Sequence, residues 1–203
     1  MRNTIIENSC EKAGDDMIRT HRLPCLLPAD QARALNQESG RIYTATLVQH
    51  YRLYRQVGHI WLHPLKHDKV LRFFCGPTFL HAHSYQAAQQ DFYEACKTAK
   101  ALKKSSPTAR YPYKRKWYHT TTWKNTGITV QGRQMRLALA QGYDPLWVPL
   151  PEHLVGLPEM AYRQVQLVYD IATNQNHWHL TIEDGQLPAA SAHTGVMAVD
   201  LGE

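Results

Sequence analysis

The stretch AYRQVQLVYDIATNQNHWHLTIEDG, residues 161–185, has the alternating pattern of a β-hairpin. Apolar side chains occupy every second position of its two arms: Val165, Leu167 and Tyr169 in the first, and Trp178, Leu180 and Ile182 in the second. Side chains two positions apart lie on the same face of a strand, so each arm has one apolar face. The segment ATNQN, residues 172–176, separates the arms and is rich in residues that favour turns. The sequence therefore predicts an antiparallel pair of strands with one buried face.

Three shorter segments also have the character of strands. TGITVQGRQMRLALAQG, residues 126–142, has alternating apolar residues on both sides of Gly132, which predicts a second hairpin. LWVPLP, residues 146–151, is a short strand that its two prolines restrict to the edge of a sheet. MIRTHRLPCLL, residues 17–27, is apolar enough for a strand, and Pro24 again favours an edge position.

Two segments between these strands have helical periodicity. Residues 28–58 begin with a proline that suits a first helical turn and end with a glycine that can terminate the helix. Residues 84–104 form the second predicted helix, with Ser84 as its N-cap and lysines near its C-terminal end. Residues 59–82 fit either short buried strands or an irregular connection. The first helix has an apolar, aromatic stripe at intervals near 3.6, which predicts a packed face: Leu35, Tyr43, Leu47, Tyr51 and Tyr54.

The order of these elements indicates an α+β chain in which a helical insertion interrupts an antiparallel β-module. The N-terminal part, residues 1–16, is polar and is predicted to be a flexible leader. We expect residues 17–28 and 106–192 to form the β-domain and residues 29–105 to form the helical insertion. We expect residues 193–203 to contain a new buried strand that opens a further domain.

Several classes of protein do not fit this sequence. No apolar run approaches the about 18 residues that a membrane span needs, and the polar leader lacks the apolar core of a secretory signal. The four cysteines are too widely spaced for a C-x-x-C zinc site, and free thiols fit a reducing compartment. We therefore expect a cytoplasmic protein that binds neither a membrane nor a small-molecule substrate. Two histidine pairs have no third ligand at a suitable spacing and are interpreted as surface residues: His81 with His83, and His177 with His179.

Charge is distributed unevenly along the chain, whose net charge is +6. Residues 95–143 carry 11 basic residues and no acidic residue, whereas residues 144–203 carry 8 acidic residues and one basic residue. Residues 1–94 are nearly balanced, with 11 basic and 9 acidic residues. An acid-free basic block of this length favours a polyanionic partner.

Within the basic block, residues 109–124 read ARYPYKRKWYHTTTWK, so basic and aromatic side chains interleave. Cations can bind phosphates, and aromatic rings can stack on unpaired bases. The alternative is a solvated basic loop whose aromatic residues belong to the core. The predicted nucleic-acid-binding residues are Arg110, Tyr113, Lys114, Arg115, Lys116, Trp117 and Lys124, together with Lys97, Lys100, Lys103 and Lys104 on the preceding helix.

One carboxylate stands at the end of an apolar strand near the C-terminus. In GVMAVDLGE, residues 195–203, Asp200 follows the apolar run and precedes a glycine by two positions. A strand-borne aspartate of this kind opens RNase H-like nucleases, where it holds a divalent metal ion. The same pattern resembles the first phosphate motif of actin-like and sugar-kinase ATPases. A third interpretation is a structural aspartate that backbone amides satisfy.

Taken together, these segments resemble the OrfB/TnpB proteins of small insertion sequences, which are relatives of type V CRISPR nucleases. The resemblance covers nearly the whole chain after residue 17 and rests on the order and spacing of four segments. It implies a wedge-type antiparallel β-barrel, a helical recognition insertion and the first strand of an RNase H-like (RuvC) domain. The four segments are RLPCLLPADQARAL (22–35), ARYPYKRKW (109–117), VQLVYDIATNQNHWHLTI (165–182) and GVMAVDLGE (195–203).

The resemblance also implies a function in transposition: RNA-guided, metal-dependent cleavage of DNA, with a guide RNA and target DNA as partners. Asp200 would be the first catalytic carboxylate and a ligand of Mg²⁺. The family's later carboxylates and its zinc-binding ribbon fall beyond residue 203, so we expect this chain to be a truncated, inactive part of the endonuclease. The alternative is a non-cleaving nucleic-acid-binding protein of the same descent, such as a domesticated repressor.

Overall fold

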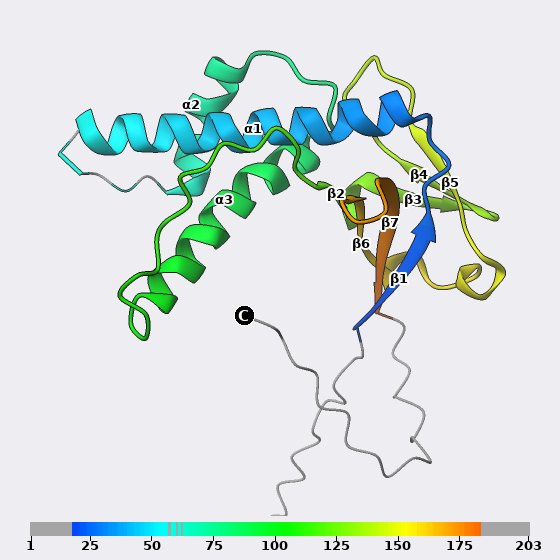
Figure 1. The fold of residues 1–203 in the computed structure, drawn as a ribbon. Helices are drawn as coiled ribbons and strands as arrows, with labels where there is room; N and C mark the ends of the chain where they lie inside the picture. Colours follow the sequence, from blue (N-terminus) through cyan, green and yellow to red (C-terminus); the bar gives the residue numbers. More distant parts are fainter. Residues whose placement is uncertain (1–17, 57, 60, 62, 184–203) are drawn as a thin grey trace, which may run out of the picture.

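The computed structural model describes residues 18–56, 58–59, 61 and 63–183, which form a helical layer beside two antiparallel β-sheets (Figure 1). The predicted leader and the predicted strand at 193–203 lie outside the described residues. The elements occur in the order β1 (Ile18–Pro24), α1 (Ala29–Gln56), α2 (Pro64–Cys75), α3 (Ala82–Leu102), β2 (Thr121–Lys124), β3 (Ile128–Gln131), β4 (Gln134–Leu137), β5 (Leu146–Pro149), β6 (Tyr162–Asp170) and β7 (Gln175–Glu183), with short 3-10 turns at Asn125–Gly127, Glu152–Leu154 and Glu159–Ala161.

The predicted hairpin is confirmed as β6 and β7, which form the middle of a four-stranded antiparallel sheet in the order β1-β7-β6-β2. Trp178 lies between Leu23 of β1 and Leu167 of β6, and Leu167 in turn pairs with Thr121 of β2. Asn174 closes the turn at a φ of 54°, a conformation that asparagine adopts more readily than most residues. The strand before the helices and the strand after them thus occupy opposite edges of one sheet.

The second sheet has the order β3-β4-β5 and contains the other predicted hairpin, with Gly132 at its turn and the proline-bearing β5 at its edge. The two sheets share one hydrophobic core, but the described strands do not close into a barrel. Trp123 of β2 joins the sheets: its ring packs edge-on against Trp178 at 5.8 Å, and its Nε1 donates a 2.8 Å hydrogen bond to the Ala138 carbonyl beyond β4.

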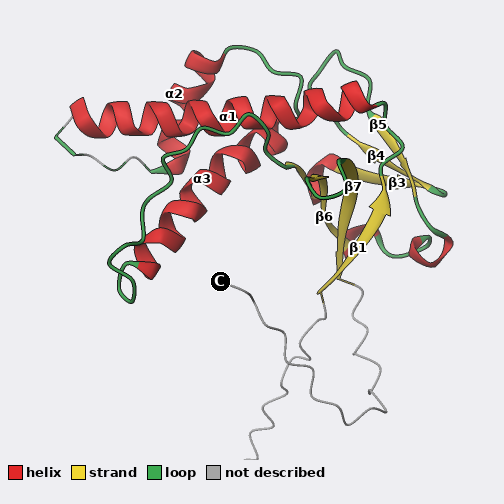
Figure 2. Cartoon of the chain, in the orientation of Figure 1, coloured by secondary structure: helices red, strands yellow, loops and turns green. Residues whose placement is uncertain are grey.

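The three helices gather beside the sheets, and α1 extends from the strands across the whole helical layer (Figure 2). The aromatic stripe predicted for α1 is confirmed as a packed face in its first part, where Leu35, Tyr43 and Leu47 are buried. Tyr43 and Leu47 form a second core cluster with three residues of α3: Phe92, Tyr93 and Cys96. Tyr51 is half-buried, and its hydroxyl hydrogen-bonds to Pro112 in the segment after α3.

Residues 59–82 contain a helix, α2, in place of the predicted strands or irregular connection. Its start is fixed by Pro64 in the first turn and by His63, whose Nδ1 accepts a hydrogen bond from the Leu65 N–H. Its end is fixed by Gly76 at a φ of 67°. Histidine is not among the usual N-cap residues, so the sequence did not indicate this start.

Three histidines in the predicted surface pairs have other roles. The second long helix, α3, begins at Ala82 with His81 as its N-cap; Ser84 is not the cap but a buried residue of the first turn. His177 and His179, predicted to face solvent, alternate with the buried Trp178 and are half-buried. They lie on β7, where they pair with Pro24 and Arg22 of the neighbouring edge strand β1. Within the described residues, no three potential metal ligands gather.

Two other histidines are fully buried between the helices. His50 of α1 and His67 of α2 are both 0% exposed and approach the hydroxyl of Tyr93 from α3. His67 Nδ1 lies 2.7 Å from that oxygen and His50 Nδ1 lies 3.5 Å from it. Burial, and to a lesser degree the neighbouring His67, lowers the pKa of His50 to about 4; burial also lowers the pKa of His67. Both rings are therefore neutral in the folded protein at pH 7.

We expect the protein to lose stability as the pH falls from 7 to 5. The unfolded chain takes up a proton on each histidine near pH 6.5, whereas folded His50 resists protonation until about pH 4. Each such group makes the free energy of unfolding fall by at most about 1.4 kcal/mol per pH unit within that window. In His50→Phe, urea unfolding between pH 7 and 5 should show a shallower pH dependence. His59→Asn, which changes an exposed histidine at a φ of 66°, is the control and should keep the wild-type slope. Equal slopes in wild type and His50→Phe would contradict this account.

Candidate nucleic-acid interface

The chain between α3 and β2 runs back along α1 without helix or strand (Figure 1). This docked segment, residues 109–120, contains most of the predicted nucleic-acid-binding residues. Its course is fixed by hydrogen bonds to three points along α1, about two helical turns apart. The Tyr51 hydroxyl donates to the Pro112 carbonyl at 2.9 Å, and the Asn36 carbonyl accepts from the His119 N–H at 3.0 Å. Between them, the Thr44 hydroxyl lies 2.9 Å from the Lys116 carbonyl and 3.0 Å from its N–H.

Gly40 allows the docked segment to touch the backbone of α1. A Cβ at this position would lie 2.7 Å from the Trp117 carbonyl oxygen and 2.8 Å from its carbon. Real Cβ atoms essentially never come that close to backbone atoms, so any other residue would force the segment away. Close packing of the docked segment therefore explains why a glycine occurs inside this long helix, although glycine destabilises the helix itself.

A buried polar cluster continues this contact into the sheet. Asn36 is 1% exposed, and its Oδ1 accepts hydrogen bonds from the N–H and the hydroxyl of Thr121 at 3.1 and 3.0 Å. Its Nδ2 donates to Asn176 Oδ1 at 3.3 Å, and Ser39 Oγ lies 2.8 Å from the Thr121 hydroxyl. Because buried polar groups cost free energy unless they are paired, this cluster fixes the position of β2 relative to α1.

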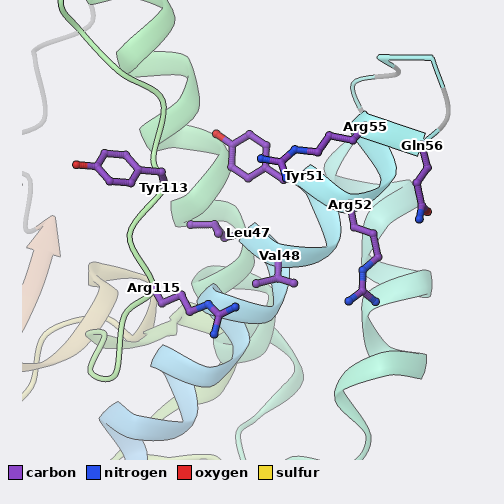
Figure 3. Close-up of a pocket in the computed structure, with 8 residues that line it drawn as sticks. All are labelled: Leu47, Val48, Tyr51, Arg52, Arg55, Gln56, Tyr113 and Arg115. Carbon is purple, nitrogen blue, oxygen red and sulfur yellow. The ribbon is translucent and has the colours of Figure 1, made fainter.

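The docked segment and the second half of α1 enclose a hollow of about 620 Å³, which we name the arginine groove (Figure 3). Three arginines line it: Arg52 and Arg55 from α1, and Arg115 from the docked segment. Among the ion pairs of the described residues, none involves these three arginines. The remaining lining residues are Leu47, Val48, Tyr51, Gln56 and Tyr113.

Arg52 and Arg55 were not predicted from the sequence. They lie in the block of residues 1–94, where basic and acidic residues nearly balance. Their spacing of three places them on neighbouring positions of one helix face, which is a local signal of a basic patch. Only the docking of the segment against α1 brings Arg115 to the same groove.

Lys116, by contrast, points back into the protein. Its ammonium lies 4.2 Å from the centre of the Tyr43 ring and 3.3 Å from His119 Nδ1. Although much of the residue is exposed, burial of this end lowers the pKa of Lys116, and the nearby Asp91 opposes the shift. These contacts favour a role in holding the docked segment, so Lys116 is a weaker candidate for a phosphate contact than Lys114 and Arg115.

The other predicted residues are spread over two further surfaces. Lys97 and Lys100 line a separate hollow of about 430 Å³ with Tyr111 of the docked segment. Lys103, just after α3, places its ammonium 4.4 Å from the centre of the same Tyr111 ring. Lys124 lies apart on β2, where it donates a 2.8 Å hydrogen bond to Gln90. The exposed residues Lys104, Arg110, Tyr113, Lys114 and Trp117 complete the basic, aromatic surface.

Asp200, the predicted catalytic residue and metal ligand, lies outside the described residues. No helix within the described part of the chain is long and apolar enough to cross a membrane. Comparison of the sequence with known protein families and with curated proteins found no match.

We expect Gly40→Ala to destabilise the protein, although alanine is the better helix former. The propensity gain is about 1 kcal/mol, whereas forcing atoms into a closed contact costs about 1–3 kcal/mol. Ala34→Gly, at an exposed position of the same helix, measures the difference in helix propensity alone and should destabilise the protein by about 1 kcal/mol. Urea unfolding measures both changes. A Gly40→Ala protein that is more stable than wild type would show that the segment does not rest on α1.

Proposed function

We propose that this chain binds a nucleic-acid strand, with the phosphate backbone in the arginine groove. The observation that carries the proposal is that one hollow is lined by three arginines from two elements far apart in the sequence, none with a carboxylate partner among the described residues. The planar guanidinium forms paired hydrogen bonds to phosphate oxygens, and its charge does not depend on pH in the physiological range. The Tyr51 ring lies beside Arg55 and adds flat apolar surface next to the cations.

The wider charge distribution supports a polyanionic ligand over a single acidic group. The 11 basic residues of the acid-free block lie in the second half of α3, just after it, in the docked segment, and in the region of β2 to β4. Lys97 and Lys100 extend the basic surface beyond the groove. A ligand with many regularly spaced charges can engage such a surface along its length, whereas a small anion can use only one part of it.

The finer proposal rests on the resemblance to OrfB/TnpB proteins. In that scheme the β-domain acts as a wedge-type barrel, the helices act as the recognition insertion, and residues 193–203 open a RuvC domain. The chain would hold a guide RNA and target DNA in the cytoplasm, and Asp200 would bind Mg²⁺ together with the later carboxylates of that family. In the chain, the three helices occur between β1 and β2, which are strands of the same sheet. This order supports the predicted interruption of a β-module by a helical insertion. A non-cleaving binder of the same descent would use the same groove without the metal site.

Removing two of the groove's cations should weaken RNA binding and its dependence on salt. For Arg52→Gln/Arg55→Gln, we expect at least about tenfold weaker binding to a labelled RNA hairpin with single-stranded ends at 50 mM salt. The slope of log K against log salt should become shallower by about 1.4, because each lost contact to a single strand removes about 0.7. Fluorescence anisotropy over 50–200 mM salt measures both quantities.

The control for this experiment is Lys66→Gln/Lys69→Gln, which removes the same charge from exposed positions of α2 outside the groove. It should retain most of the wild-type affinity and nearly the wild-type slope. If the two double variants behave alike, binding reflects net charge and the groove has no special role. If wild type does not bind RNA at 50 mM salt, the proposed function is wrong.

The finer proposal makes its own prediction about Asp200. In a chain that carries the complete set of RuvC carboxylates, Asp200→Ala should abolish guide-dependent cleavage of a plasmid in the presence of Mg²⁺, because a metal ligand is lost. RNA binding should be unchanged, since Arg52, Arg55 and Arg115 supply the proposed phosphate contacts. Cleavage by the variant would refute the RuvC assignment, and a variant that fails to fold would instead identify Asp200 as a structural residue.

A further inference from the structure

A second hollow lies next to the arginine groove and differs from it in character. This hollow, which we name the Trp117 pocket, has a volume of about 710 Å³ and lies between α1, the end of α2 and the docked segment. Val48 and Arg115 line both hollows, so the two are adjacent parts of one surface along α1. Phe74 and Trp117 supply its aromatic walls.

The two aromatic walls are unusually exposed. The Trp117 residue is 85% exposed and the Phe74 residue is 55% exposed, although both are large apolar side chains that most proteins bury at least in part. The Trp117 side chain is held out by its own backbone, which is fixed against Gly40. Paired exposed aromatic residues over an apolar pocket are typical of a binding site for a flat ligand.

Two of the three cations around the Trp117 pocket, Arg41 and Lys116, are already engaged by contacts within the protein, which argues against a second phosphate site. Arg41 donates two hydrogen bonds to the Glu38 carboxylate at 2.6 and 2.8 Å and a third to the Cys75 carbonyl at 2.7 Å. The Lys116 ammonium lies over the Tyr43 ring. Arg115, at the border with the arginine groove, has no ion pair among the described residues.

We propose that the Trp117 pocket receives an unpaired nucleobase, stacked on Trp117 and Phe74, from the strand whose phosphates lie in the arginine groove. This inference rests on the proposed function and adds the form of the ligand. A base within a duplex already stacks on both of its faces, whereas a base in a single-stranded loop or end is free to stack on protein. The chain thereby selects single-stranded or locally opened nucleic acid over continuous duplex.

The ligand for the test is a short single-stranded RNA with one 2-aminopurine, whose fluorescence falls when the base stacks on an aromatic ring. We expect wild type to quench this fluorescence and to bind the single strand more tightly than the same sequence in a duplex. Trp117→Ala should abolish most of the quenching and raise Kd by about 5- to 150-fold. The matched control is Trp147→Ala, which removes a 42% exposed tryptophan from β5 in the other sheet and should change neither quantity.

The outcomes separate the inference from the function on which it rests. If the RNA binds at low salt but Trp117→Ala and Trp147→Ala cannot be distinguished, the base pocket is wrong and the phosphate groove stands. Equal affinity for single strand and duplex without quenching overturns the inference in the same way. If neither RNA form binds wild type at 50 mM salt, both the phosphate groove and the base pocket are wrong. An apolar side chain of a protein partner is then the alternative ligand of the Trp117 pocket.

Discussion

The direct contact between the backbones of α1 and of residues 116–117 is the constraint on which the remaining architecture depends. Only glycine leaves room for it, because a Cβ at position 40 would overlap the Trp117 carbonyl. On one side of the contact, the segment places Arg115 next to the arginines of α1 and turns Trp117 outward. On the other side, the chain enters β2 at Thr121, which Asn36 holds and which pairs with Leu167 of the sheet. One close approach thus sets the position of the basic surface relative to both the helices and the strands.

The basic residues of this region divide into those that the fold uses and those that remain available to a ligand. Arg41 is occupied by Glu38 and a carbonyl, and the Lys116 ammonium lies over an aromatic ring. Arg52, Arg55 and Arg115 line an open groove instead. Net charge cannot make this distinction, since it counts every cation equally. The geometry concentrates the available charge on one groove and leaves the neighbouring pocket apolar, which is the arrangement that a phosphate chain with projecting bases requires.

The parts of the fold that could be predicted from the sequence are those whose signal is local. Alternating residues defined both hairpins, and the helical period defined α1 and α3. Helix α2 was not predicted, because its N-cap is His63 and because its sequence fits short apolar strands as well. The arginine groove could not be predicted as a unit, since tertiary contacts bring residues 52 and 55 to residue 115. The Asn36 cluster could not be predicted either. An asparagine within a helical pattern does not indicate that its side chain will accept a hydrogen bond from the backbone of a strand 85 residues later.

The pairing of β1 with β7 has a consequence for how the chain is made. Among the described strands, β1 pairs with β7 alone, and α1, α2 and α3 are synthesised between them. At about 5–20 residues per second, the roughly 150 intervening residues take about 8–30 s to emerge from a ribosome. During that interval β1 is an unpaired strand next to folding helices, and its partner arrives only after β6. Closure of the four-stranded sheet is therefore a late step in biosynthesis, governed by chain length as much as by the stability of the hairpin.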